Sequence, residues 1–294
     1  MMATEDTTST FGGIEIPDIV RRLLTNRKVA ISLAVLIPIV IVTALGETIA
    51  PHDSLTTDVA NRYAGPGGTY PLGTDNLGRD LLSRVIVGGQ SSLLLGFGAT
   101  GVSLALGVPI GLIAGYAKGR IDEVLMRLMD IVMSVPVLLL GVLILVALPS
   151  NIFNVIVAVG AVFIPRIARV TRSATLSVSE EPYVLAAKAR GESTTHILFK
   201  EILPNVTAPI IIEGSIRVGY AILVGTSLSF LGLGTGPPHA DWGYMIATAR
   251  LHIYQTPWFL LWPSLALLVT IMSTNVLGDG LRDVLDPRAT EDNL

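Results

Sequence analysis

Runs of apolar residues long enough to cross a lipid bilayer limit most what this chain can fold into. A spanning helix needs about 20 mostly apolar residues, and six segments of the 294-residue sequence approach or exceed this length. They are residues 29–46, 93–117, 124–148, 152–170, 206–233 and 258–277. The fourth segment is long enough to span the bilayer only if its helix continues past Arg166. The sequence therefore predicts an all-α polytopic membrane protein with six transmembrane helices.

The composition supports a membrane protein and excludes several other classes. Only 15% of the residues are charged, against about 25% in a soluble domain, and mean hydropathy is +0.64. So apolar a chain is not disordered, and its net charge of −3 provides no basic face for nucleic acid. The sequence contains no Cys, which rules out disulfides and thiolate metal sites. We therefore expect the lipid bilayer as a partner and no nucleic acid.

The distribution of Lys and Arg predicts how the chain crosses the membrane. Six spans place both termini on one side, and fifteen Lys and Arg fall on that side against four on the other. Positive loops stay in the cytoplasm, so we expect cytoplasmic tails over residues 1–28 and 285–294. The transmembrane domain would cover 29–284 in the inner or plasma membrane. No small-residue cleavage site follows the first apolar run, which we interpret as an uncleaved span.

A charged cytoplasmic segment, residues 171–205, carries the signals for a short helix and a turn. Pro182 suits the first turn of a helix, and residues 183–190 are good helix formers with an Ala-rich face. Gly191 can take the left-handed conformation that ends a helix. The pattern predicts a short helix followed by a sharp change of direction.

A second short helix is expected after this turn. Ser193 or Thr194 can cap it, and Pro204 would stop it and turn the chain into the fifth span. The apolar residues of the helix pair are Ala186, Ala187, Ile197, Leu198 and Ile202. Such a pair can lie in a groove of a soluble partner, or pack on its own bundle as an ordinary loop. The residues alone leave both interpretations open.

Two short motifs in this segment form a known pattern, Ala186-Ala187-x-x-x-Gly191 and Ile202-Leu203-Pro204. They resemble the EAA coupling loop of ABC-transporter permeases, although Leu185 stands where that motif often has Glu. The resemblance implies a helix pair that couples the permease to partner ATPases, with the angle between the helices set by Gly191. The residues it implicates are Tyr183, Leu185, Ala186, Ala187, Gly191, Ile202, Leu203 and Pro204.

Three further segments extend the similarity from about residue 70 to 288. They read YPLGTDNLGRDLLSR over 70–84, LSFLGLG from 228 with DWG ending at 243, and LGDGLRDVLDPR over 277–288. These segments resemble parts of the dipeptide/oligopeptide permeases, and the last resembles their C-type subunit. The resemblance implies the type I importer permease fold. It also implies a subunit that forms half of the path of an ATP-driven ABC importer for dipeptides or oligopeptides.

The same resemblance implies partners for this chain. They would be a second related permease subunit, two ATP-binding subunits and an external substrate-binding protein. No Lys in the sequence follows a Gly, so the chain lacks the Gly-Lys-Ser/Thr phosphate loop. ATP and Mg are therefore expected on the partner subunits, with no cofactor, metal or catalytic residue in this chain. We predict a permease and not an enzyme.

Four charged residues before the second span alternate in sign at near-helical spacing: Asp75, Arg79, Asp80 and Arg84. Asp80 and Arg84 are four apart, a helix pair worth about 0.2–0.5 kcal/mol. The pattern predicts a lateral helix at the outer surface. That helix would shape an external gate or dock the binding protein, or it would be a solvated structural helix.

Charges also occur inside the expected spans. Glu213 and Arg217 lie four apart in the fifth span, where a central charge costs about 2.5–3.5 kcal/mol. Pairing or a wet cavity is therefore expected, and the two would line the transport path or form a structural ion pair. Asp130 in the third span is a similar case. Gly107, Gly111, Gly115 and Gly119 form a small-residue stripe that favours close helix packing.

Two other functions compete with an importer subunit. A stand-alone secondary transporter or channel needs ionisable groups near the midplane and broken helices, and Pro109 and Pro136 interrupt spans. It would leave the cytoplasmic helix pair without a purpose. A membrane-embedded enzyme is disfavoured because the sequence has no His-Glu-x-x-His and no Gly-x-Ser-x-Gly. Co-purification with an ATPase separates the importer subunit from both.

Overall fold

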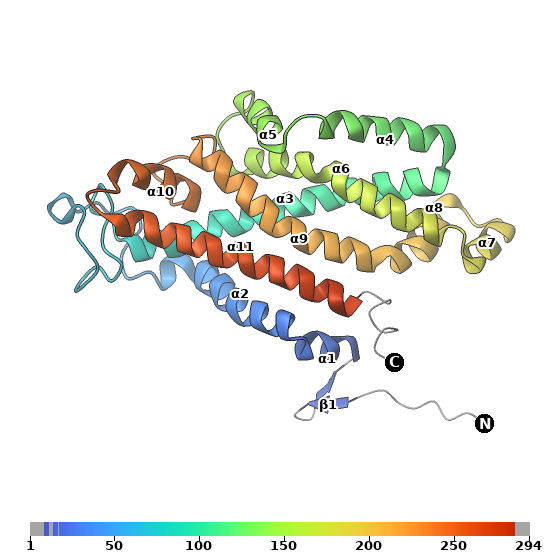
Figure 1. Ribbon diagram of the computed structural model, residues 1–294, viewed down its shortest axis with the longest axis horizontal. Helices are drawn as coiled ribbons and strands as arrows, with labels where there is room; N and C mark the ends of the chain where they lie inside the picture. Colours follow the sequence, from blue (N-terminus) through green and yellow to red (C-terminus); the bar gives the residue numbers. More distant parts are fainter. Residues whose placement is uncertain (1–8, 12–13, 17, 286–294) are drawn as a thin grey trace.

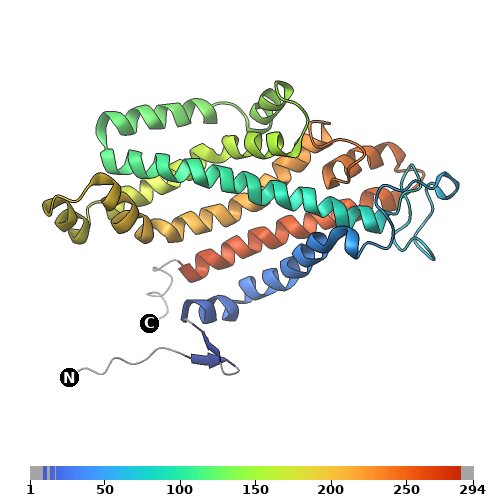
Figure 2. The same cartoon turned by 180° about the vertical axis from the view of Figure 1, so that it is seen from behind.

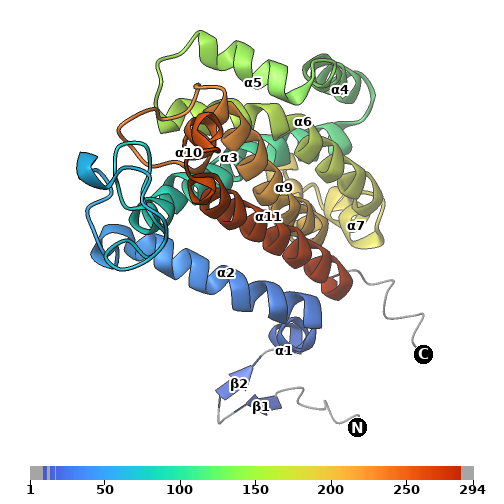
Figure 3. The same ribbon diagram turned by 60° about the vertical axis from the view of Figure 1, so that its left-hand side comes forward.

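The computed structural model describes residues 9–11, 14–16 and 18–285, which form an elongated bundle of long helices (Figure 1). The long helices are α2 (Arg27–Leu45), α3 (Leu81–Ala117), α6 (Ile152–Val178), α9 (Leu203–Phe230) and α11 (Pro257–Leu285). Helices α3, α6 and α9 pack against one another, and α11 and α2 lie along one side of them (Figures 1 and 2). The opposite side carries α4 (Gly119–Met133) and α5 (Val137–Val146) (Figure 3).

Short elements gather at the two ends of the bundle (Figure 1). One end holds α7 (Pro182–Ala189), α8 (Thr194–His196) and the π-helical turn η3 (Ile197–Ile202). The other end holds the 3-10 turns η1 (Gly46–Thr48), η2 (Val59–Asn61) and η4 (Arg250–His252), with α10 (Trp242–Ala249). An antiparallel hairpin of β1 (Ser9–Phe11) and β2 (Ile14–Ile16) and helix α1 (Asp18–Thr25) precede α2.

The ends of the described chain lie on the same side as α7 (Figure 1). Lys28 Nζ and Asp283 Oδ2 are 2.7 Å apart and join the start of α2 to the end of α11. Of the two expected tails, residues 1–8, 12–13, 17 and 286–294 lie outside the described residues. The start of α2 and the C-terminal end of α11 therefore lie side by side.

The third expected span, residues 124–148, is not one continuous helix but two helices, and its crossing of the membrane stays a prediction. Five helices are individually long and apolar enough to cross a membrane, and α4 with α5 makes a sixth crossing only as a pair bent by 86°. The bend follows from Pro136, which has no amide hydrogen to donate and disfavours helical backbone at Val135. Pro136 instead becomes the N-cap residue of α5, with extended backbone at φ −55° and ψ 135°.

Other helices extend beyond the expected spans. α3 begins at Leu81, twelve residues before the expected second span, and α6 continues to Val178. Three Arg therefore lie within α6, namely Arg166, Arg169 and Arg172. Hydropathy alone underestimates such helices because their ends carry polar side chains that pair with other residues.

Close packing of α3 on α6 depends on the small-residue stripe. A Cβ on Gly111 would lie 2.6 Å from the Thr171 Cβ, and one on Gly115 would lie 2.7 Å from the Thr175 Cβ. These distances are too short for non-bonded carbon atoms, which pack at about 3.5–4.0 Å. The stripe on α3 is thus used for packing inside this chain, as small residues are in membrane helices generally.

Candidate coupling loop and charged cavity

The loop between α6 and α9 has the expected helix, turn and helix. Pro182 stands in the first turn of α7, and Gly191 follows with φ +78°, a left-handed conformation that other residues rarely adopt. No atom lies within 4 Å of the position a Cβ on Gly191 would take, so only the backbone angle requires glycine there. Ser193 Oγ then accepts a hydrogen bond from the His196 amide at 3.3 Å and caps α8.

The expected stop at Pro204 was wrong, because the chain runs through it into α9. The π-helical turn η3 precedes it, and the Leu203 amide donates to the Leu198 carbonyl five residues back. This wider turn puts Pro204 in the first turn of α9, where the missing amide hydrogen costs no hydrogen bond. The second helix of the loop is therefore continuous with the span that follows.

One face of this loop is packed on the bundle of its own chain. Val184, Ala187 and Ile202 are fully buried, and they form a cluster with Leu112 of α3 and Val206 of α9. The buried face therefore fixes the helix pair to two of the central helices.

The other face of the loop is exposed. Leu185 is 52% exposed and Phe199 50%, and Tyr183 is also accessible. Ala186, Gly191 and Pro204 are exposed as well, whereas Leu203 is half-buried. Phe199 was missed by the sequence reasoning, although it is the one aromatic residue of the second helix and lies off its buried face. One face of the loop thus packs on its own bundle, as an ordinary loop would, and the other is free to contact a partner.

Ion pairs tie the two halves of the loop to each other and to the bundle. Arg190 Nη2 lies 3.8 Å from Glu201 Oε1, and Lys118 Nζ lies 2.9 Å from Glu180 Oε1. The hydrogen bond from Lys118 lowers the pKa of the Glu180 carboxyl. These pairs are exposed, so each adds little stability. They orient the loop more than they stabilise it.

Asp75, Arg79, Asp80 and Arg84 do not form a lateral helix, and this expectation was wrong: the first two precede α3, Asp80 is its N-cap and Arg84 lies in its first turn. Asp75 to Gly78 is a turn in which the Gly78 amide donates to the Asp75 carbonyl at 3.1 Å, with Gly78 at φ +77°. Asp80 is the N-cap of α3 and accepts a hydrogen bond from the Ser83 amide at 2.9 Å. The left-handed glycine interrupts the helical periodicity that the charges suggested.

These four side chains are buried; Asp75 pairs with both Arg, and Asp80 bonds to Ser83 and lies 3.5 Å from His52 Nδ1. Arg79 Nε lies 2.6 Å and Arg84 Nε 3.5 Å from Asp75 Oδ2, and all four residues are at most 7% exposed. Arg84 also donates to the Ser54 carbonyl at 2.9 Å. Arg84 therefore pairs with Asp75 and not with Asp80. The cluster is neither a solvated helix nor an exposed contact surface; it fastens the outer loop to the start of α3.

Glu213 and Arg217 form the expected ion pair, and a third residue joins them. The Glu213 Oε1 atom lies 2.9 Å from Arg217 Nε and 3.3 Å from Arg166 Nε of α6. Arg166 was not expected at this site because it lies on another helix, 47 residues earlier in the sequence. Arg217 also stacks on the Tyr220 ring, with 4.7 Å between its Cζ atom and the ring centroid.

Arg166 and Arg217 line a cavity of about 350 Å³ that opens between α4, α5, α6 and α9. Its other walls are Val132, Met133, Val135, Val137, Val162, Phe163 and Tyr220. The break between α4 and α5 forms one side, so the first residue of α5 faces the cavity. The two Arg stand at the middle of α6 and of α9, as the bounds of these helices show.

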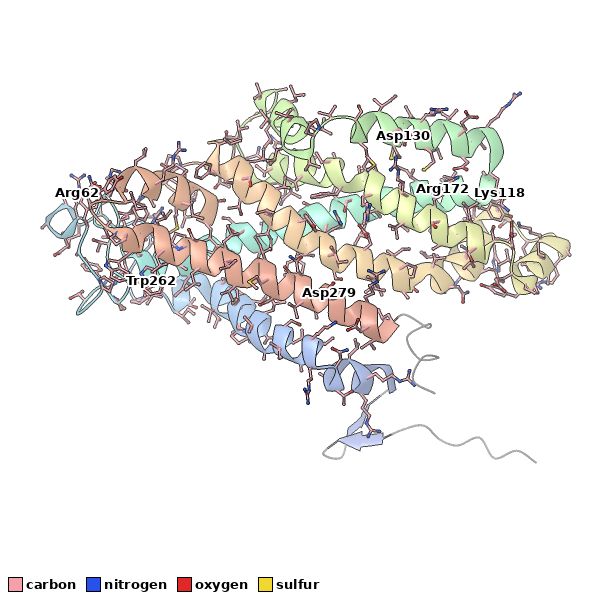
Figure 4. All side chains as sticks on the ribbon, viewed as in Figure 1. Arg62, Lys118, Asp130, Arg172, Trp262 and Asp279 are labelled. Carbon is pink, nitrogen blue, oxygen red and sulfur yellow. The ribbon has the colours of Figure 1, made fainter. Side chains whose placement is uncertain are left out.

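The other two Arg of α6 pair with α4. Arg172 Nη2 lies 2.6 Å from Asp122 Oδ2, and Arg169 pairs with Asp130. Figure 4 shows Asp130 on α4 and Arg172 on the adjacent α6. Each of the three Arg residues of α6 thus has an acidic partner on another helix, Glu213 on α9 or Asp130 and Asp122 on α4. Among the described residues, no group of three His, Asp or Glu is arranged to hold a metal ion.

The helices, the anchored loop and the charged cavity define a polytopic membrane transport permease. A family model described as "Binding-protein-dependent transport system inner membrane component" matches residues 107–291, and one described as "N-terminal TM domain of oligopeptide transport permease C" matches residues 17–66. The chain belongs to the family of binding-protein-dependent transport system inner membrane components, among the C-type permeases of peptide ABC transporters. It is a permease and not an enzyme, because separate subunits hydrolyse ATP in such systems.

Named relatives cover nearly the whole chain. A putative peptide transport system permease protein of Brucella abortus is 41% identical over 91% of this chain and 90% of its own length. The probable D,D-dipeptide transport system permease protein of Escherichia coli is 39% identical over 82% of this chain and 81% of its own length. The oligopeptide transport system permease protein of Bacillus subtilis is 35% identical over 92% of this chain and 89% of its own length.

A solved structure has the same fold at low sequence identity. It is an inward-facing MetNI methionine ABC transporter, with a TM-score of 0.57 and 17% identity over 68% of this chain and 96% of that one. This similarity agrees with the type I importer permease fold that the family resemblance implied. It concerns the fold alone.

Proposed function

We propose that this chain forms half of the translocation path of an ATP-driven importer of dipeptides or oligopeptides. A second, related permease subunit would form the other half, and an external binding protein would deliver the peptide. The names of the relatives support a peptide substrate. The outer loop that Asp75, Arg79, Asp80 and Arg84 fasten to α3 is the proposed site at which the binding protein docks.

Two ATP-binding subunits, which hold ATP and Mg, are proposed to dock on the loop between α6 and α9. The observation that carries this proposal is the two-faced loop: Ala187 and Ile202 are buried against the bundle, while Leu185 and Phe199 are about half exposed on the other face. Exposed apolar residues on short helices are suited to a hydrophobic groove of a partner. The excess of Lys and Arg at this end supports a cytoplasmic position for the loop and for both termini.

Movement of the ATP-binding subunits would then reach the path through the buried face. A rigid-body shift of α7 is carried to α3 and α9 because Ala187 packs in one cluster with Leu112 and Val206. The continuous connection from η3 into α9 makes the second helix of the loop an extension of a span. A stand-alone secondary transporter has no use for such a surface and is not favoured.

Cysteine crosslinking tests the docking site directly, because the natural chain has no Cys. Leu185→Cys in the assembled complex is expected to crosslink to an ATP-binding subunit. Leu251→Cys is the matched control, since Leu251 is 69% exposed at the opposite end of the bundle. A crosslink to the ATP-binding subunit from Leu251→Cys, or none from Leu185→Cys, would contradict the proposed docking site.

A further inference from the structure

The cavity between α4, α5, α6 and α9 holds more positive than negative charge. Two guanidinium groups, of Arg166 and Arg217, approach one oxygen of a single carboxylate, Glu213. Arg stays protonated in proteins, so the group as a whole carries one uncompensated positive charge. Among the described residues, no acidic side chain lines the cavity itself, and Asp130 on α4 is paired with Arg169.

Part of this positive charge is available to a ligand. The Arg166 side chain is 56% exposed, whereas the Glu213 side chain is only 11% exposed. The Arg217 side chain is only 13% exposed, and its Nε atom lies 2.9 Å from Glu213 Oε1. Its guanidinium is held between the rings of Tyr220 and Phe163, at 4.7 and 5.6 Å. Glu213 and the two rings therefore hold the guanidinium groups in place, while one carboxylate balances only one of the two positive charges.

The depth of the cavity makes this charge costly without an anion. Both Arg lie within helices long and apolar enough to cross a membrane, and a charge at the centre of a span that faced lipid would cost about 2.5–3.5 kcal/mol on insertion scales. The exposed side of Arg166 must therefore face water or a partner in the assembled transporter. The start of α5, at Val137, lies at the same cavity and brings the positive end of a helix dipole to it.

We propose that Arg166 and Arg217 bind the carboxylate of the transported substrate inside the membrane, with Glu213 positioning both guanidinium groups. A carboxylate accepts paired hydrogen bonds from Arg better than from any other side chain. A peptide with a free C-terminus supplies such a group whatever its sequence, which suits a path that must accept different side chains. This proposal rests on the proposed peptide-importing function and adds the part of the substrate that is recognised in the path.

Residue-specific chemical protection tests the proposal in the assembled transporter with its loaded binding protein. Phenylglyoxal modifies Arg166 and Arg169 at rates that mass spectrometry can follow, and their side chains are similarly exposed, 56% and 44%. The probes are alanyl-phenylalanine and its C-terminal amide. We expect the free acid to slow modification of Arg166 at least about 3-fold and the amide to leave it unchanged, since only the acid offers a carboxylate to the guanidinium groups. Arg169 should not respond to either.

Three results would overturn the carboxylate site. They are equal protection by the acid and the amide, no protection of Arg166 by either, or equal protection of Arg166 and Arg169. Protection by anionic phospholipid in the absence of peptide would assign the site to a lipid phosphate instead. Repeating the experiment in vesicles of zwitterionic and of anionic lipid separates these two sources.

Uptake by variants provides an independent measurement. Arg217→Gln is expected to lower ATP-dependent uptake of alanyl-phenylalanine at least about 10-fold, and Arg217→Lys to lower it less, because Lys keeps the charge. A residue needed only for structure would not separate Gln from Lys when the complex assembles equally. The control is Arg169→Gln with Asp130→Asn, which removes a neighbouring pair outside the cavity.

Failure of the proposed function and failure of the carboxylate site give different results. If the unmodified transporter shows no ATP-dependent peptide uptake, the proposed function fails. If it shows uptake and Arg217→Gln matches it, only the carboxylate site fails.

Discussion

Gly191 gives a direct test of the coupling loop, because its backbone angle and its surroundings make separate demands. With φ at +78°, a side chain at this position is strained, yet nothing within 4 Å would collide with it. The cost of substitution is therefore conformational, about 1–2 kcal/mol for an ordinary residue in this region. One or two kcal/mol lowers the ratio of the native turn to its alternatives by about 5- to 30-fold, which is the largest loss of the native turn that this strain can cause.

The matched pair of variants is Gly191→Val and Gly191→Asn. Val is β-branched and disfavours positive φ, whereas Asn adopts it more readily than other residues. In proteoliposomes that contain the assembled complex, ATP-dependent peptide uptake should fall by about 5- to 30-fold in Gly191→Val. In Gly191→Asn it should stay within about 3-fold of the unmodified protein. The amount of inserted protein should be equal, because the turn lies outside the spans.

Both outcomes that would refute this reasoning are measurable in the same vesicles. Uptake by Gly191→Val at the rate of the unmodified protein would mean that the angle of the turn does not govern coupling. Equal loss in Val and Asn would mean that glycine is required for space against the ATP-binding subunit and not for its backbone. The rate of ATP hydrolysis, measured beside uptake, tells loss of coupling from loss of assembly.

Three further predictions follow from the packing. Asp75→Asn leaves Arg79 and Arg84 buried without a charge partner and should destabilise the outer loop by about 3–5 kcal/mol; an unchanged melting temperature would contradict the buried cluster. Gly111→Val should separate α3 from α6 and lower the melting temperature, while Gly101→Val, where a Cβ meets nothing within 4 Å, should not; equal melting temperatures would refute the packing. Phe199→Ser should weaken binding of the ATP-binding subunits by about 10-fold, which pull-down titration measures, and Phe153→Ser at the other end should have no effect.

The coupling loop was the part of the site most accessible to sequence reasoning. Its features are local: a proline starts α7, a glycine takes positive φ, and Ser193 caps the next helix. The error at Pro204 arose because a proline after an apolar helix signals either a stop or the first turn of a new helix. The π-helical turn that decides between them has no distinct pattern in the sequence.

The charged residues show what one-dimensional patterns cannot determine. Asp75 and Arg84 belong to one cluster, although their spacing of nine residues suggests no contact, and Gly78 breaks the helix that the charge pattern predicted. Arg166 meets Glu213 only because α6 and α9 cross at their midpoints. Such pairing between distant elements depends on packing that a single sequence does not specify.

The bend between α4 and α5 could be predicted only in part from the sequence. Pro136 was visible as an interruption of the third expected span, and its effect on Val135 follows from backbone sterics. The direction of the bend does not follow from that. It depends on how Asp122 and Asp130 hold α4 against the Arg of α6, and it leaves the cavity open at the level of Arg217.

The central claim is that this chain is a moving conduit driven by ATP-binding subunits and not a transporter by itself. The most direct measurement is uptake of a labelled dipeptide into proteoliposomes, with the chain reconstituted alone or together with the second permease subunit, the ATP-binding subunits and the binding protein. The account predicts uptake only in the complete assembly and only with ATP and Mg. Uptake by the chain alone, driven by an ion gradient, would contradict it.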